Sequence, residues 1–235
     1  QLNDERYNKI NKPFSILLIG TLTSTNSVDD RKNLVNSIKW ICEEFADNDD
    51  VGIVLKTSLG KGTTIDRTLC REAVNNIAKN FRKGSNPKIS LVHGNMSADE
   101  VNALYAHSKI KLYASATRGE GYGLPLIEAA ASGLPIVVTG WSGHLEFLEK
   151  GLFGSVDYEL AEISETRVDN RIFEKGFMWA EPKEESFKLE IRNVYKDYKN
   201  AKKKATSLKA KIWLNYNSKK IKNAYSEVFN GLMEK

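Results

Sequence analysis

Short apolar runs alternate with longer amphipathic runs five times between Phe14 and Val138, and this alternation limits the fold more than any other feature. Apolar runs typical of buried strands lie at 14–19, 51–55, 89–92, 110–114 and 135–138. Helical stripes lie at 31–45, 64–81, 97–106 and 124–132. Because the strands are apolar on both faces, we predict an α/β, Rossmann-like, doubly wound parallel sheet covered by helices.

The pattern changes after Gly151. Residues 155–180 show no period, so we expect an irregular insertion there, and 183–198, 201–213 and 218–232 are predicted to be helices. We expect residues 1–12, which are polar, to be a linker from an N-terminal domain that this chain lacks. Residues 13–182 would then form the Rossmann-like domain, and residues 183–235 would pack on it as trailing helices.

The net charge of +5 is unevenly distributed. Residues 183–235 hold 14 basic and 6 acidic residues, a net of +8, which leaves 21 against 24, a net of −3, in residues 1–182. The basic helices either present a solvated face or make peripheral contact with an anionic membrane or an acidic partner. No nucleic-acid recognition module is found, so nucleic acid is not an expected partner.

The chain has no apolar run of about 20 residues and no secretion-signal core at residues 1–12, so we expect a cytoplasmic protein, at most at the inner face of the membrane. Cys42 and Cys70 are then reduced thiols, far from any metal-ligand spacing. The three histidines are scattered, and a lone histidine is more often structural than catalytic. No cluster of carboxylates that would hold a metal ion is found, so we expect no metal. The histidines are His93, His107 and His144.

The segment Ala116–Gly143 carries the chemistry expected of the chain. It leaves a predicted strand and enters a predicted helix through Gly119, Gly121 and Gly123. Glycines at such a turn let backbone amides approach a ligand, and the helix N-terminus favours a phosphate. The spacing G-x-G-x-G is not the dinucleotide fingerprint. The other tempting segment, GKGT at 60–63, lacks phosphate-loop spacing and is predicted to be a turn.

Glu128 stands in a helix that is otherwise apolar or small, LPLIEAAASG. An ionised carboxylate in such a helix needs a partner. It either pairs with a buried arginine or faces a wet gap, or it accepts hydrogen bonds from a ligand, as acidic residues of this fold type do from ribose. We favour the ligand, because the helix begins at the glycine-rich loop.

The run EGYGLPLIE from Glu120 to Glu128 resembles the E-x7-E signature of family four, the retaining glycosyltransferases of group 1 with two Rossmann-like domains (GT-B type). The flanking GLPIVV run and Ser142-Gly143 agree with that family. The resemblance is strongest between Asp99 and Gly151. It implies that this chain is the C-terminal, donor-binding domain.

The resemblance also implies roles for individual residues. Glu128 would bind the donor ribose, Glu120 would lie near the transferred sugar, and Lys32 with Arg31 would stabilise the departing diphosphate. Many family members have an arginine where this chain has Thr21, which leaves the diphosphate site less charged. Further binding positions would come from the glycine-rich loop, Gly121, Tyr122, Gly123 and Leu124, and from the base-holding loop, His93, Gly94 and Met96. Lys56 is either a surface lysine or a phosphate contact.

The implied reaction moves a sugar from a UDP- or GDP-sugar to a hydroxyl of a glycan, lipid or protein acceptor, with retention of configuration and no required cofactor. The acceptor would be held by the N-terminal domain, so we expect the isolated chain to be inactive. Two alternatives stay open: a sugar-nucleotide epimerase or phosphorylase of the same architecture, and a non-catalytic nucleotide-binding module. The presence of both Glu120 and Glu128 argues against the second.

Overall fold

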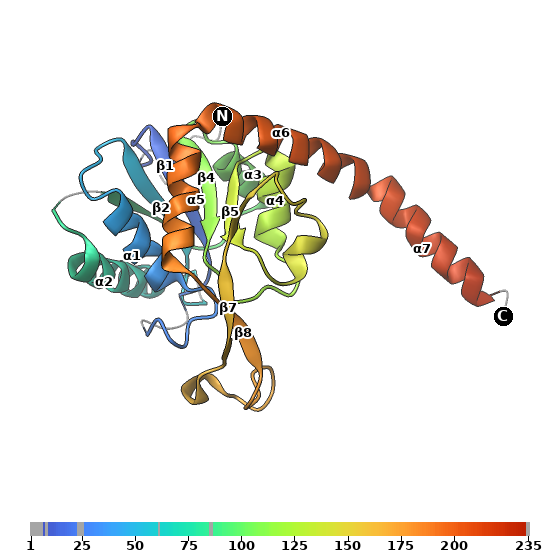
Figure 1. The fold of residues 1–235 in the computed structure, drawn as a ribbon, viewed down its shortest axis with the longest axis horizontal. Helices are drawn as coiled ribbons and strands as arrows, with labels where there is room; N and C mark the ends of the chain where they lie inside the picture. Colours follow the sequence, from blue (N-terminus) through green and yellow to red (C-terminus); the bar gives the residue numbers. More distant parts are fainter. Residues whose placement is uncertain (1–6, 8, 23–25, 61, 85–86, 234–235) are drawn as a thin grey trace.

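The computed structural model describes residues 7, 9–22, 26–60, 62–84 and 87–233. Its centre is a six-stranded parallel sheet in the order β3-β2-β1-β4-β5-β6 (Figure 1). The chain adds strands on one side of β1 as far as β3 and then returns to add β4, β5 and β6 on the other side. This is the Rossmann arrangement, and it confirms the predicted fold class. The strands are β1 (Phe14–Ile19), β2 (Val51–Thr57), β3 (Lys88–His93), β4 (Ile110–Ser115), β5 (Ile136–Thr139) and β6 (Gly154–Val156).

Helices cover both faces of this sheet, and α5 and α6 continue that cover after the last strand (Figure 1). The prediction that all the trailing helices pack on the domain was wrong for α7, which extends away from the body and has exposed side chains as far as Asn230 (Figure 1). Within the described residues, no helix is both long and apolar enough to cross a bilayer. The helices are α1 (Leu34–Glu44), α2 (Thr64–Phe81), α3 (Ala98–Tyr105), α4 (Leu124–Ser132), α5 (Glu184–Lys196), α6 (Tyr198–Asn215) and α7 (Ser218–Met233), with short 3-10 helices η1 (Gly143–Glu146) and η2 (Glu165–Arg167).

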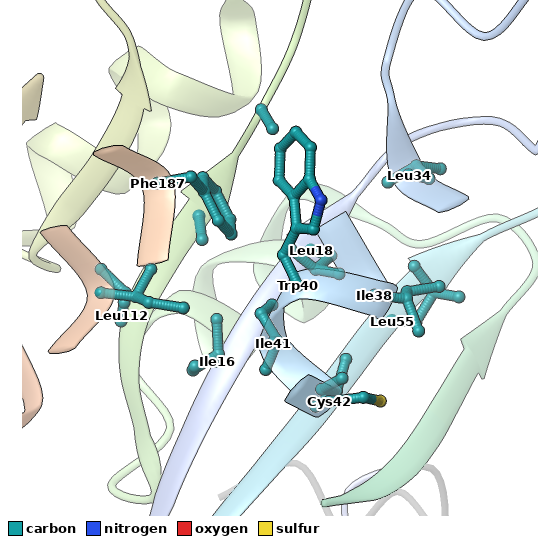
Figure 2. Packing of buried hydrophobic residues seen from close by; sticks show 14 of the residues in the cluster. Ile16, Leu18, Leu34, Ile38, Trp40, Ile41, Cys42, Leu55, Leu112 and Phe187 are labelled. Atoms are coloured by element: carbon teal, nitrogen blue, oxygen red, sulfur yellow. The ribbon is translucent and has the colours of Figure 1, made fainter. Parts of the chain in front are cut away.

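The core has two apolar clusters, one on each face of the sheet. In β1, Ile16 and Leu18 enter one cluster and Leu17 enters the other, and all three are fully buried. Figure 2 shows the first cluster, where Trp40 of α1 packs against Phe187 of α5 with ring centroids 5.5 Å apart. Burial on both faces is the reason that the strands are continuous apolar runs in the sequence.

The apolar stripe predicted a helix from residue 31, but helix α1 begins only at Leu34. The buried Asp30 carboxylate accepts hydrogen bonds from the backbone N–H of Lys32 (3.0 Å) and of Leu34 (2.7 Å). Asn33 adopts a left-handed conformation, with φ of 52°. The carboxylate thus closes a turn ahead of the helix, and Arg31 and Lys32 lie in that turn. By contrast, α3 begins with a capping box formed by Ser97 and Glu100.

The prediction that 155–180 is irregular was wrong. Most of β6 lies within this segment, and β7 (Tyr158–Glu162) pairs with β8 (Met178–Pro182) in an antiparallel arm that projects from the sheet (Figure 1). A two-stranded ribbon leaves many side chains exposed, so the alternation of burial that marks a strand is weak. The arm has a small apolar cluster of its own, formed by Ile163, Phe173 and Trp179.

The described part of the predicted linker at 1–12 lies on the domain. Tyr7 and Ile10 are buried, and the Tyr7 hydroxyl donates to the carbonyl of Glu100 (2.7 Å). Residues 1–6 and 8 are outside the described part of the chain. In the trailing helices, the half-buried Lys202 donates to the carbonyl of Gly133 (2.6 Å), at the end of α4. This lysine therefore belongs to a packing contact and is not part of a free basic face.

Candidate functional site

The loops that follow β1, β4 and β5 meet at the carboxyl edge of the sheet, where ligands bind in folds of this kind. A cavity of about 700 Å³ lies between these loops and the β7–β8 arm. Its polar wall contains Arg31, Lys32 and Glu120, and its apolar wall contains Trp141, Phe177 and Trp179. The volume is within the range of small-molecule sites.

Glu120 binds both cations of the turn before α1. Its carboxylate lies 2.5 Å from Lys32 Nζ and 3.5 Å from Arg31 Nη1, and its side chain is 8% exposed. Burial alone would raise the pKa of Glu120, but the charges of Lys32 and Arg31 lower this pKa below its ordinary value. The three predicted catalytic residues therefore form one ionised cluster. Arg31 also donates to the carbonyl of Gly119.

The glycine-rich loop has a backbone that only glycine tolerates at one position. Gly123, which precedes α4, has φ of 87°, and a Cβ there would lie 3.2 Å from the Cβ of His144. Because the loop ends at the start of α4, its backbone N–H groups are at the positive end of the helix dipole. Gly121 lines the cavity, whereas Tyr122 and Leu124 are exposed beside it.

The loop after β5 holds the glycine-rich loop in place. Ser142 Oγ donates to the carbonyl of Glu120 (2.6 Å) and accepts from the Glu120 N–H (2.9 Å). Gly143 is pressed against the carbonyl of Gly121, where a Cβ would collide. Ser142 has φ of 103° and ψ of −174°, a region that is strained for any residue with a side chain. The strained residue, Ser142, is thus the one that hydrogen-bonds the backbone of Glu120.

Glu128 lies on an exposed face of α4 and is not buried in the apolar helix packing. Its carboxylate accepts a hydrogen bond from the Tyr105 hydroxyl (3.1 Å), and that hydroxyl also lies 3.1 Å from the carbonyl of Pro125. No ion pair is found for Glu128 within the described residues. Pairing with a buried arginine therefore does not apply, and the carboxylate has oxygen lone pairs available to solvent or to a ligand.

The predicted base-holding loop uses its side chains largely for its own structure. Lys56 Nζ donates to the carbonyl of Gly94 (2.8 Å), so Lys56 supports the loop. The His93 side chain is 5% exposed and turns toward Asp66, and Met96 packs against the core. A second cavity of about 370 Å³ is lined by His93 and Gly94. The predicted site residues are thus divided between two cavities and the exposed face of α4.

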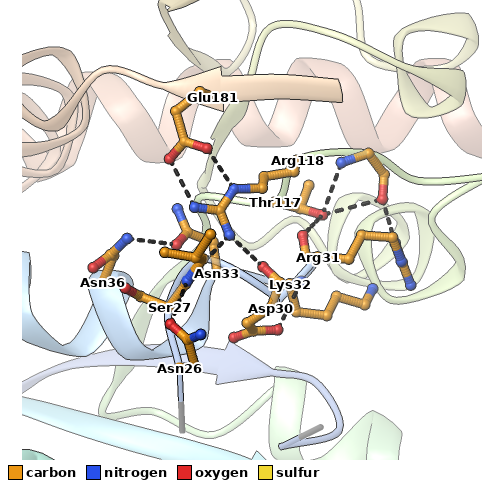
Figure 3. A network of polar contacts seen from close by, with 12 residues as sticks. Asn26, Ser27, Asp30, Arg31, Lys32, Asn33, Asn36, Thr117, Arg118 and Glu181 are labelled. Carbon is orange, nitrogen blue, oxygen red and sulfur yellow. Dashed lines mark hydrogen bonds and ion pairs between the residues drawn. The ribbon is translucent and has the colours of Figure 1, made fainter. Parts of the chain in front are cut away.

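Arg118 was missed from the sequence, yet it joins three parts of the site (Figure 3). Its guanidinium donates to both carboxylate oxygens of Glu181 on β8 (2.5 and 2.8 Å) and to the carbonyls of Ser27 (2.6 Å) and Asp30 (2.7 Å). It also lies 4.9 Å from the centre of the Trp179 ring. The one signal in the sequence was a charged residue in the loop that follows a buried strand. The hydrogen-bond partners of its side chain are 63 to 91 residues away.

His144 has the structural role expected of a lone histidine. It is fully buried, and its Nε2 lies 2.8 Å from the carbonyl of Thr139. Burial lowers the pKa of His144, so its ring is neutral. The ring contributes to the packing of the loop after β5 beneath the cavity.

Solved structures define the class of this fold. The chain matches the C-terminal domain of a glycosyl transferase group 1 family protein (LpcC) from Francisella tularensis, with a TM-score of 0.60, 16% identity and 90% of each chain covered. It matches Anabaena Alr3699/HepE, in complex with UDP and glucose, with a TM-score of 0.63 and 13% identity. It also matches the pneumococcal O-GlcNAc transferase GtfA, in complex with UDP and GlcNAc, with a TM-score of 0.52 and 20% identity. The fold is that of the GT-B glycosyltransferases.

The chain covers only part of the larger neighbours. HepE is matched over 96% of this chain and 50% of its own length, and GtfA over 93% and 36%. Residues 68–220 match the family described as family 4 glycosyltransferases in conflict systems. Because this match includes more than half of the chain, the chain belongs to that glycosyltransferase family. No curated protein matches it.

Proposed function

We propose that the chain is the donor-binding domain of a retaining glycosyltransferase and binds a nucleoside diphosphate sugar at the carboxyl edge of its sheet. The observation that carries this proposal is the cluster of Glu120, Lys32 and Arg31 at the cavity beside the glycine-rich loop. The UDP complexes of HepE and GtfA support a nucleotide-sugar donor.

In this proposal Lys32 and Arg31, which pair with Glu120, also contact the diphosphate of the donor. The two cations and the N–H groups before α4 stabilise negative charge on the departing diphosphate. Glu120 then offsets positive charge at the anomeric carbon of the sugar. Attack comes from the same face, and the leaving phosphate accepts the proton of the acceptor hydroxyl.

The apolar wall of the cavity suits the sugar end of the donor and the approaching acceptor. Trp141 comes from the loop after β5, while Phe177 and Trp179 come from the β7–β8 arm. Aromatic walls with a few placed polar groups are typical of sites for small organic ligands. The arm thus makes the cavity deeper on the side away from the nucleotide.

The ribose is assigned to Glu128, and this role is tested by calorimetry with UDP and GDP. Glu128→Gln removes charge-assisted hydrogen bonds worth roughly 1.5–3 kcal/mol each, so affinity should fall at least tenfold. Glu72→Gln, an exposed glutamate on α2, is the control. Equal affinity of Glu128→Gln and the parent chain would remove Glu128 from the site.

The sugar role of Glu120 needs a separate variant. Glu120→Gln should bind nucleoside diphosphate about as well as the parent, because its proposed ligand is the sugar. In a protein with the acceptor half present, the same change should lower kcat, since its effect arises as charge develops. If Glu120→Gln weakens nucleotide binding as much as Glu128→Gln does, the division of roles between the two glutamates is wrong.

A further inference from the structure

Three side chains with different metal-binding atoms meet where α2 lies beside the end of β3. Asp66 and Cys70 are one turn apart on α2, and His93 is the last residue of β3. One ligand atom from each residue can be chosen so that all three lie within 4.8 Å of one another. Cys70 Sγ lies 3.6 Å from Asp66 Oδ1, and His93 Nε2 lies 3.3 Å from Asp66 Oδ2.

The imidazole of His93 provides a second, independent observation. Its Nε2 is buried and has no hydrogen-bond partner, although the carboxylate of Asp66 is only 3.3 Å away. A buried ring nitrogen without a hydrogen-bond partner destabilises the fold unless another group binds it. The nitrogen lies beside the thiol and the carboxylate, which is where a cation held by all three residues would sit.

We propose that Asp66, Cys70 and His93 bind one Zn²⁺ ion. Thiolate, imidazole and carboxylate are the protein ligands that zinc takes, and tetrahedral geometry with ordinary bond lengths separates such ligand atoms by about 3.4–3.6 Å. His93 Nε2 lies 3.3 Å from Oδ2 of Asp66 and Cys70 Sγ lies 3.6 Å from its other oxygen, Oδ1, so a carboxylate oxygen lies at about this spacing from each of the other two ligands. A thiolate and a carboxylate together also balance the charge of the ion.

The surroundings complete the site. The backbone N–H of Leu59 donates to Asp66 Oδ1 (2.9 Å), which orients the carboxylate as an outer partner does in zinc proteins. His93 borders the cavity of about 370 Å³ that Gly94 also lines, so water can supply the fourth ligand. The ion would join the start of α2 to the end of β3, directly before the loop at 94–96.

The test is Co²⁺ and Zn²⁺ binding to the full chain, freed of metal by a chelator and kept reduced. We expect one Co²⁺ per chain, with a thiolate charge-transfer band and the strong visible bands of a tetrahedral site, and displacement by Zn²⁺. Loss of an outer partner costs 10- to 100-fold in metal affinity, so loss of a direct ligand in Cys70→Ser, His93→Gln or Asp66→Asn should cost at least about 100-fold.

Matched controls separate ligand loss from misfolding. Cys42→Ser alters the other buried thiol, which belongs to no such group within the described residues, and His107→Gln alters another histidine. Both controls should bind metal like the parent. Zn²⁺ should raise the Tm of the parent but not of His93→Gln, which has lost one of the three ligands. The proposal is overturned if the parent binds no stoichiometric metal, or if folded His93→Gln binds it unchanged.

Discussion

At the scale of the residue, Glu120 is kept ionised by its two cations in spite of its burial. Its folded-state pKa lies below the ordinary value of 4.5, so its ion pairs stabilise the fold above that pH and are lost as pH falls through the lower value. Glu120→Gln should therefore lower the Tm at neutral pH by several degrees, because about 1 kcal/mol corresponds to roughly 2–4 °C in a domain of this size.

The measurement is thermal unfolding of the parent and of Glu120→Gln across a pH series. The difference between them should shrink as the pH drops below 4.5 and should be lost below the lower folded-state pKa, where the parent carboxylate is also neutral. A difference that is the same at every pH would show that charge is not the cause, and would point to the packing of the loop instead.

Lys32 is the cation closest to Glu120, and we expect it also to contact a diphosphate. Lys32→Met removes that charge, so affinity for a nucleoside diphosphate should fall about tenfold or more. Affinity for the nucleoside alone should not change, because it has no phosphate. Calorimetry with UDP and uridine, or GDP and guanosine, checks this, and Lys150→Met, on an exposed turn, is the matched control. An equal loss for nucleoside and diphosphate would place Lys32 away from the phosphates.

At the scale of the element, Arg118 attaches the β7–β8 arm to the loops that carry Lys32 and Glu120. Arg118→Met leaves two carbonyls and Glu181 without their donor, and should destabilise the domain by about 2–4 kcal/mol. Arg167→Met, on the same arm with a part-exposed ion pair to Asp169, should cost less than about 1 kcal/mol. Urea unfolding measures both, and equal costs would contradict the anchoring role of Arg118.

The elements buried on both faces were predictable from the sequence, because two-sided burial leaves a continuous apolar run. The strands β1 and β5 have the predicted bounds to within a residue. Strand β6 was missed because it has three residues, too few for any period. The arm was missed because β7 is largely exposed and β8 shows no regular alternation of buried and exposed side chains. The start of α1 was misplaced because the Asp30 carboxylate replaces its first turn.

The candidate site divides in the same way. Local spacing was enough to single out Glu120, Glu128 and the glycines, because they share one short segment. Contacts between distant segments left no such pattern: Glu181 lies 63 residues from Arg118, and His93 lies 27 residues from Asp66. The lack of metal-ligand spacing around the cysteines predicted no metal site. The proposed zinc ligands come from a helix and the following strand, and such ligands leave no local spacing to detect.

At the scale of the whole molecule, the chain matches half the length of HepE and about a third of the length of GtfA. We propose that an acceptor-binding half completes the cavity from the side of the β7–β8 arm. A site closed from one side only binds its donor weakly, since closure preorganises the ligand. We therefore expect this chain alone to bind a nucleoside diphosphate without appreciable sugar transfer. Efficient transfer to an acceptor by this chain would contradict that expectation.

Calorimetry of the parent chain with UDP, GDP, ADP and the corresponding nucleosides tests the central claim most directly. We predict binding of one nucleoside diphosphate per chain, with at least one of the three preferred and the matching nucleoside bound at least tenfold more weakly. That difference would reflect the cations and the helix N-terminus at the diphosphate. No binding of any nucleoside diphosphate, or equal binding of nucleoside and diphosphate, would contradict a donor site at the carboxyl edge of this sheet.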